Sequence, residues 1–460
     1  MSGRLARLFD VDEAEAPRVA LAAAAGFCVL GAWFVVRPLR DAMGTLGRAG
    51  ELEKLLIVTP ALMLALTPLL FFAASRLPRH RFVALAYRAF ALSLLAFAPA
   101  LARPHEAIAP GAARAFFLWT SVLNFFALSI FWGTMADRFT HRQGLRSFGV
   151  IGAGGTLGAL AGSLVTASAV QRFGPLPLLV LSAGLFEVAL RLLRRIAPAA
   201  PVDVVPAAAV VDTVDVARPP EATADAAPSP GRAARNAVAR VVSNPYLLGI
   251  AGYVLCWALT STFIYLEQAA LARSALPDPN ARAALFAKIE AAVQASSLVL
   301  QAFATGRLLR VLGAGRSLAV LPALSLVGFA ALGAAPRLGL LVAFQLVRRT
   351  LDFGLAKPAR ELLFTVVDRD DKYKTKSVID TVVYRGGDAL GSVVAGTAAP
   401  ALGASPALLA LPLCALWFAL ALYLGAASER RARGARNAAG SAPAQPAGAA
   451  HVNGKLEGRL

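Results

Sequence analysis

Several charged side chains lie within or at the ends of long apolar runs, where they are costly in lipid and commonly mark a transport pathway or a partner pair. The stretch FVVRPLRDAMG (34–44) contains Arg37, Arg40 and Asp41. Arg37 and Asp41 are four residues apart, so they share one face of a helix. Two interpretations stay open. One is an ion pair near the membrane interface. The other is a cationic rim over a cavity, in which Arg37 and Arg40 contact an anion and Asp41 acts in coupling or gating.

A second cluster lies in QLVRRTLDFGLAKPARELLF (345–364). Arg348 and Asp352 are four residues apart, and Arg349 and Asp352 are three apart, so either arginine could neutralise the aspartate. This spacing predicts a charge pair at the cytoplasmic end of a helix. Such a pair can also hold one state of a transporter closed, so Arg348 and Asp352 are candidate gating residues.

A third cluster, in SVIDTVVYRGGDALG (377–391), places Asp380, Tyr384 and Asp388 on one helical stripe with Arg385 beside it. This much polarity in one span favours a cavity over lipid contact. A guanidinium offers a fork of donors that matches phosphate or carboxylate. We therefore predict that Arg385 and Tyr384 bind an anionic substrate and that Asp380 and Asp388 act in coupling or gating. The alternative for Arg385 is a buried pair with Asp388.

One further carboxylate, Glu267, closes another apolar run beside Tyr265. A lone glutamate in a span can act in coupling, whereas one near a helix end is commonly interfacial. We keep Glu267 as a coupling candidate with the interfacial alternative open.

No arrangement of residues in the sequence is typical of catalysis or metal binding. The three cysteines, Cys28, Cys256 and Cys414, each lie inside an apolar run, which is typical of small buried side chains. The four histidines form no cluster with ligand spacing. We therefore predict no metal, no cofactor and no enzymatic activity.

The composition indicates a membrane protein. The 460 residues are 57% hydrophobic and 16% charged, with a mean hydropathy of +0.62. A soluble domain carries about 25% charged residues, so a soluble enzyme is disfavoured, and disordered, collagen-like and disulfide-rich classes are excluded.

The apolar residues fall into runs long enough to cross a bilayer. They predict twelve helices near 19–40, 55–74, 82–101, 114–134, 148–170, 175–193, 245–266, 284–304, 316–334, 338–356, 378–399 and 406–425. The predicted organisation is a cytoplasmic N-terminus (1–18), a first six-helix half (19–195), a flexible linker (196–243), a second half (244–427) and a disordered basic tail (428–460).

The excess of basic residues, +19 in formal charge, reports topology. The short loops on the predicted cytoplasmic side carry 18 Lys and Arg, against 8 on the other side. This bias places both termini in the cytoplasm, and it removes the main argument for nucleic-acid binding.

Six helices, a linker and six more helices are the plan of the major facilitator fold, with two halves around a central cavity. In the fifth predicted helix, Gly154, Gly158 and Gly162 repeat every four residues. This pattern is typical of close helix packing. It lacks the lysine of a phosphate-binding loop.

Four stretches resemble the ATP/ADP antiporter family of plastids and obligate intracellular bacteria, a divergent branch of the major facilitator type. They are Leu39-Arg40-Asp41, Phe131-Trp132-Gly133, Ser243-Asn244-Pro245-Tyr246, and the segment from Lys357-Pro358-Ala359-Arg360-Glu361 to Arg385-Gly386-Gly387. The resemblance implies nucleotide exchange by alternating access, basic cavity residues that meet phosphates, and a bacterial inner membrane as the location.

The sequence also departs from this family. Ala42-Met43-Gly44 stands where the exchangers have Thr-Lys-Asp, and Thr120 stands near their acidic residue in helix four. Arg385 keeps the charge near their lysine of helix eleven, and Glu267 lies close to their glutamate of helix seven.

Three functions therefore compete. The first is a monomeric secondary transporter of an anionic solute, nucleotide or other phosphorylated compound. The second is a proton-coupled transporter of another solute, which would depend on a carboxylate rather than on Arg385. The third is a membrane scaffold or sensor, in which the charges pair internally and leave no continuous cavity.

Overall fold

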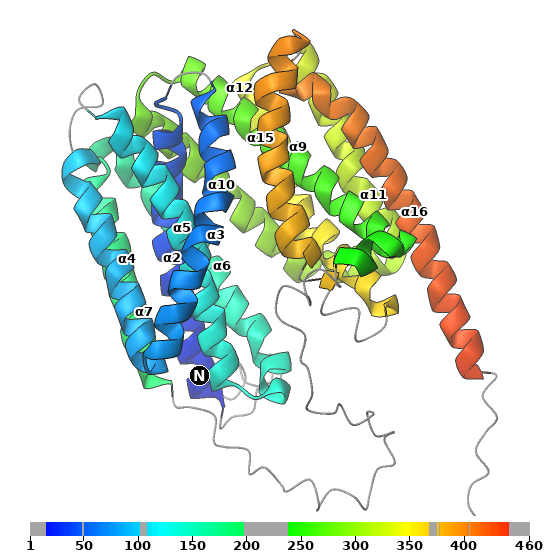
Figure 1. Ribbon diagram of the computed structural model, residues 1–460, viewed down its shortest axis with the longest axis horizontal. Helices are drawn as coiled ribbons and strands as arrows, with labels where there is room; N and C mark the ends of the chain where they lie inside the picture. Colours follow the sequence, from blue (N-terminus) through cyan, green and yellow to red (C-terminus); the bar gives the residue numbers. More distant parts are fainter. Residues whose placement is uncertain are drawn as a thin grey trace, which may run out of the picture.

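The computed structural model describes residues 15–47, 50–101, 108–196, 238–367, 375–376, 378–403 and 405–440. Every regular element in these ranges is a helix, and the helices form an N-terminal and a C-terminal half (Figure 1). The helices of the N-terminal half are α2 (Ala16–Gly44), α3 (Glu51–Arg76), α4 (Arg79–Leu101), α5 (Pro110–Arg138), α6 (His141–Phe173) and α7 (Leu176–Arg195).

The C-terminal half begins with three long helices and continues with two segmented ones. The long helices are α9 (Pro245–Ala275), α10 (Pro279–Phe303) and α11 (Thr305–Ala334). The tenth predicted span is α12 (Leu338–Leu351), followed by the π-turn η2 (Asp352–Ala356), α13 (Lys357–Leu363) and the short 3₁₀ turn η3 (Phe364–Val366). The eleventh is the π-turn η4 (Ile379–Val383) followed by α15 (Tyr384–Ala401), and α16 (Pro406–Gly440) is the last.

All twelve predicted spans coincide with these helical segments. Ten of the described helices are long and apolar enough to cross a membrane. Of the two remaining spans, the tenth is divided by the π-helical segment η2 and the eleventh begins with the π-helical segment η4. Such segments are frequent at functional sites.

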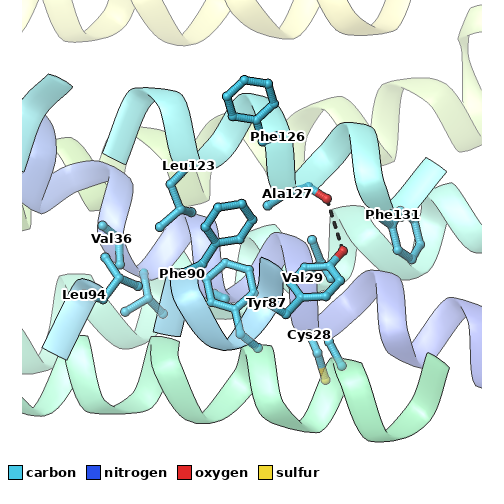
Figure 2. Close-up of a cluster of buried hydrophobic side chains, with 14 of the residues drawn as sticks. Cys28, Val29, Val36, Tyr87, Phe90, Leu94, Leu123, Phe126, Ala127 and Phe131 are labelled. Carbon is cyan, nitrogen blue, oxygen red and sulfur yellow. Dashed lines mark hydrogen bonds between the residues drawn. The ribbon is translucent and has the colours of Figure 1, made fainter. Parts of the chain in front are cut away.

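The core of the N-terminal half is built from large side chains of α2, α4 and α5 (Figure 2). Tyr87 lies 1% exposed in this core, and its hydroxyl donates a hydrogen bond to the Ala127 carbonyl oxygen at 3.1 Å. Cys28 borders the same cluster. All three cysteines are buried, as predicted.

The glycine repeat of α6 packs against α2, which confirms the packing interpretation. A Cβ atom on Gly158 would lie 2.1 Å from the Phe27 carbonyl oxygen, and one on Gly162 would lie 2.5 Å from that of Gly31. One turn further, Thr166 donates to the Val35 carbonyl oxygen at 3.0 Å. Only glycine allows the two backbones to approach this closely.

The C-terminal half repeats the arrangement of the N-terminal half. α9 packs against α15 and α16 as α2 packs against α6 and α7, and α11 packs against α16 as α4 packs against α7. The halves meet mainly where α10 packs against α6 and α2 and where α15 packs against α3, with a smaller contact between α2 and α9. This is the two-fold plan of two six-helix halves that the sequence predicts.

The start of α2, the end of α7, the start of α9 and the end of α16 lie at one end of the bundle (Figure 1). We call this the linker end, and the opposite one the far end. The placement agrees with an even number of spans, because α2 begins and α16 ends at the same end of the bundle.

The segments outside the spans differ in part from prediction. Residues 428–440 of the predicted disordered tail continue α16 as helix, and 238–243 of the predicted linker are helical. Residues 1–14, 197–237 and 441–460 lie outside the described part of the chain.

Candidate functional site

A cavity of about 650 Å³ lies between the halves. Its lining comes from α2, α3 and α5 on one side and from α9, α10, α12, η2, α13 and α15 on the other. Seven arginine or lysine side chains line it, against five aspartates or glutamates. So many charges in one cavity between membrane helices are typical of a substrate pathway.

The cavity reaches from near the far end toward the linker end. On α9 the lining runs from Gln268 back to Val254, a rise of about 21 Å. It continues to Glu361 of α13. α13 lies at the linker end, because the Tyr246 hydroxyl at the start of α9 donates to the Leu363 carbonyl oxygen at 2.9 Å.

Direct contacts between the halves close the far end. Arg273 donates to the Gly47 carbonyl oxygen at 2.8 Å, and Arg282 donates to that of Thr45 at 3.3 Å. A hydrophobic cluster there joins Leu52 and Phe117 to Phe263 and its neighbours in the C-terminal half. By contrast, among the described residues, the buried cluster around α13 and the start of α9 contains only side chains of the C-terminal half.

Asp41 ties the halves together at the cavity floor. Its Oδ1 atom accepts two bonds from Arg40, from Nε at 2.9 Å and from Nη2 at 2.5 Å. The same oxygen accepts the Tyr265 hydroxyl of α9 at 2.9 Å. The Arg40 guanidinium also lies over the rings of Trp33 and Phe117. The Arg40 guanidinium is thus paired within the protein and keeps only 15% of its side chain exposed, which favours a structural role over direct substrate binding.

Glu290 of α10 joins two arginines at the same floor. Arg37 of the N-terminal half approaches its Oε1 atom with Nη2 at 3.1 Å. Arg349 of α12 forms a two-pronged pair with both oxygens, of which Nη2 to Oε2 is 2.9 Å. The predicted Arg37–Asp41 pair is present at only 4.0 Å, so Glu290 is the closer partner of Arg37. We call Arg37, Arg40, Asp41, Tyr265, Glu290 and Arg349 the floor cluster.

Arg348 lines the cavity, and its described partners are hydroxyl groups rather than the expected Asp352. Its Nη2 atom donates to Thr260 at 3.0 Å and to Ser261 at 3.1 Å, and its Nε atom donates to Ser325 at 3.3 Å. No ion pair joins Arg348 to Asp352 among the described contacts. Asp352 lies in η2, whose wider turn changes the register that an α-helix would give.

Nearer the linker end, cationic and aromatic side chains stack. The rings of Trp257 and Tyr384 are stacked with centroids 5.2 Å apart. The Arg360 guanidinium lies over Trp257 at 5.8 Å, and that of Arg385 lies over Tyr384 at 5.2 Å and over Phe125 of the other half at 5.8 Å. We call Trp257, Arg360, Tyr384 and Arg385 the aromatic cluster.

Asp388 flanks the aromatic cluster. Its Oδ2 atom lies 3.7 Å from Arg385, and its Oδ1 atom accepts the Thr262 hydroxyl at 3.5 Å. Both contacts are long, so Arg385 is only loosely paired with its predicted alternative partner. It keeps 35% of its side chain exposed to the cavity.

Two predicted residues are not placed at the cavity. Glu267 is buried in α9 but falls outside the face that lines it, since the lining residues Tyr265 and Gln268 lie to either side. The side chain of Asp380 lies outside the described part of the chain.

The sequence patterns described above point to neither Glu290 nor Trp257 as a site residue. Glu290 lies in a predicted span two residues after Lys288, and the cost of charge in lipid is the only signal that the sequence offers for it. Trp257 gave no such signal, because tryptophan in a span is equally typical of an interface.

The four stretches that carry the family resemblance have different places in the fold. Arg40 and Asp41 belong to the floor cluster, and Arg360 to the aromatic cluster. Asn244, in contrast, caps α9, since its Oδ1 atom accepts the Tyr246 amide at 3.0 Å. Phe131 is buried in the N-terminal core.

No family model matches the chain, and no curated protein matches it by sequence. Solved structures do match. A crystal structure of the nucleoside transporter NupG, a D323A mutant, is 14% identical with a TM-score of 0.55 and covers 90% of this chain and 98% of its own. An auto-inhibited POT-family peptide transporter is 15% identical with a TM-score of 0.56, covering 90% and 97%.

A third match is a bacterial homologue of the human lysosomal transporter Spinster, in an inward-facing and unoccupied conformation. It is 14% identical with a TM-score of 0.54, covering 91% of this chain and 95% of that one. These likenesses extend over nearly the whole of both chains. Together with the apolar helices, they show that the chain is an integral membrane protein with the major facilitator fold.

Proposed function

We propose that the protein is a secondary transporter that moves an anionic solute, a nucleotide or another phosphorylated compound, by alternating access. One observation carries the proposal: a cavity between two similar halves, lined by seven basic side chains against five acidic ones, that contacts between the halves close at the far end. Rocking of the halves about such a site would expose it to each side in turn.

The proposed contacts divide between the two clusters. Arg37 and Arg385 keep 24% and 35% of their side chains exposed, so both can reach a ligand in the cavity. Guanidinium groups suit phosphate because they donate two bonds in one plane. The stacked rings of Trp257 and Tyr384 offer a surface to a planar base.

The size of the cavity agrees with this class of substrate. Pockets for compact organic ligands are commonly about 300–1,000 Å³, and 650 Å³ lies within that range. Under the predicted orientation, with both termini in the cytoplasm, the linker end is cytoplasmic. The conformation described here would then be inward-open.

The second candidate is a proton-coupled transporter of another solute. Glu267 favours it, because this carboxylate is 9% exposed within a span and has no hydrogen-bond or ion-pair partner among the described residues. The scaffold hypothesis predicts that no continuous cavity remains between the halves. The cavity described above disfavours that hypothesis.

Reconstitution into liposomes tests the proposal. We expect uptake of labelled ATP, ADP or a simpler phosphorylated compound above that of liposomes without protein. Uptake should rise when the same compound is trapped inside. Absence of uptake for every phosphorylated compound would overturn the proposal.

The same liposomes distinguish the proton-coupled candidate from the proposed anion transporter. Under an imposed proton gradient, that candidate requires uptake of an uncharged solute. It also requires that a Glu267→Gln variant lose this uptake and an Arg385→Ala variant keep it.

A further inference from the structure

One carboxylate, Glu290, holds two arginines that come from opposite halves of the molecule. Its side chain is 6% exposed, whereas Arg37 and Arg349 keep 24% and 16% of theirs exposed. The pair with Arg349 uses both oxygens, and the contact with Arg37 at 3.1 Å uses Oε1. At the floor of the cavity, the Glu290 carboxylate therefore occupies N–H groups of both guanidinium groups.

These donors are the ones that a phosphoryl group would need. A guanidinium fork binds the paired oxygens of a carboxylate and of a phosphate in the same manner. Since Arg37 and Arg349 both line the cavity, an anion that enters from the linker end meets two arginines already occupied by an internal anion.

We propose that Glu290 is an intramolecular competitor of the substrate, and that a dianionic phosphoryl group displaces it from Arg37 and Arg349. The inference rests on the proposed function and names the group of the substrate that the floor cluster recognises. A carboxylate substrate would only replace one carboxylate by another and would lose its translational freedom in doing so. A phosphoryl group brings about two negative charges to two positive ones, so it can displace Glu290 where a carboxylate cannot.

Displacement also breaks a contact between the halves. Arg37 belongs to α2 and Glu290 to α10, so their ion pair helps to keep the far end closed. An anion that takes Arg37 and Arg349 from Glu290 removes this contact, and binding is thereby linked to the movement of the halves. In the empty protein, phosphate can bind only to those molecules in which Glu290 has left the arginines. The apparent affinity for phosphate is therefore lowered in proportion to the fraction of molecules in which Glu290 still occupies them.

Binding of inorganic pyrophosphate to the purified full-length protein, measured by titration calorimetry, tests the proposal. We expect Glu290→Gln to bind it about tenfold more tightly than the wild type, or better. The matched control is Glu361→Gln, which removes the same charge from the same cavity. Glu361 pairs with Lys376 near the linker end, so its loss should change the affinity by no more than about threefold.

A second titration with succinate examines the preference for phosphoryl groups. The wild type should bind pyrophosphate in preference to succinate. Glu290→Gln should narrow this preference, because its arginines no longer require two charges on a single group to displace a carboxylate, and succinate carries its two charges on separate groups. If Glu290→Gln does not yield a monodisperse protein, Glu290→Asp replaces it. That shorter carboxylate reaches both arginines less well and should give a smaller gain in the same direction.

Equal gains from the Glu290 and Glu361 variants would overturn the competition, since general electrostatics would then explain both. Pyrophosphate binding by the wild type together with no gain in Glu290→Gln would also overturn it, while the proposed function would stand. Absence of binding in every protein, combined with absence of uptake in liposomes, would overturn both.

Discussion

The floor and aromatic clusters hold their positive charge in different ways. In the floor cluster, Arg37, Arg40 and Arg349 pair with Asp41 and Glu290. Two contacts, Arg37 with Glu290 and Tyr265 with Asp41, cross between the halves. In the aromatic cluster, Arg360 and Arg385 lie over ring faces, and their nearest described carboxylate contact is the 3.7 Å approach of Asp388.

This difference indicates that the positive side chains of one cavity have two distinct roles. A buried ion pair between halves fixes a conformation, because removing one partner leaves the other charge unpaired in a poorly solvated site. A guanidinium on a ring face keeps donors for a ligand. The contacts of the floor cluster therefore bear on conformation as well as on the anion, whereas those of the aromatic cluster bear mainly on affinity. Three substitutions test that contrast.

The largest effect is expected from Asp41→Asn. This change leaves Arg40 without a charged partner and weakens the bond from Tyr265 of the other half. We expect the free energy of unfolding to fall by about 3 kcal/mol, measured by thermal unfolding in detergent. Glu361→Gln in the same cavity should cost less than about 1 kcal/mol. Equal losses in the two variants would contradict the distinction.

A smaller effect, on affinity rather than stability, is expected from Arg385→Ala. Loss of a charge-assisted hydrogen bond should weaken pyrophosphate binding by about 1.5–3 kcal/mol, roughly ten- to a hundredfold, with little change in the unfolding temperature. Arg433→Ala, on the exposed part of α16, is the matched control. Normal binding and transport by Arg385→Ala would remove this residue from the site.

The smallest effect is expected from Trp257→Ala. Removing the stacking surface should weaken ADP binding by about 1 kcal/mol, roughly fivefold, and leave pyrophosphate binding unchanged. The ratio of the two dissociation constants is the measurement. Trp132→Ala, which changes a tryptophan outside the cavity lining, should leave the ratio as it is. A parallel loss for both ligands would show that Trp257 has a structural role and does not recognise a base.

Much of the fold was predictable because each span signals itself locally. A run of about 20 apolar residues must be a helix in lipid, where every backbone amide needs a partner within its own segment. The same locality made the packing of Gly154, Gly158 and Gly162 predictable, since a repeat of four produces one smooth face. The π-helical segments η2 and η4 carry no such local signal.

The site was only partly predictable. The predicted residues that line one cavity are Arg37, Arg40, Asp41, Arg348, Asp352, Tyr384, Arg385 and Asp388. The cost of charge in a span identified the charged ones, and the helical stripe shared with Asp388 identified Tyr384. Their partners were not identified in the same way. Spacing along one helix suggested Arg37 with Asp41 and Arg348 with Asp352, whereas the structure brings Arg37 to Glu290 and Arg348 to three hydroxyls.

The sequence by itself therefore determined the helices, their division into two sets of six and the list of charges that lipid would not accept. Only the tertiary structure decided which charges neutralise one another and which remain available at the cavity. The reason is physical. Burial in a span is a property of a residue and its neighbours in the chain, but an ion pair depends on which helices the packing brings together. Glu290 and Arg37 lie on helices of different halves, so no local pattern could join them.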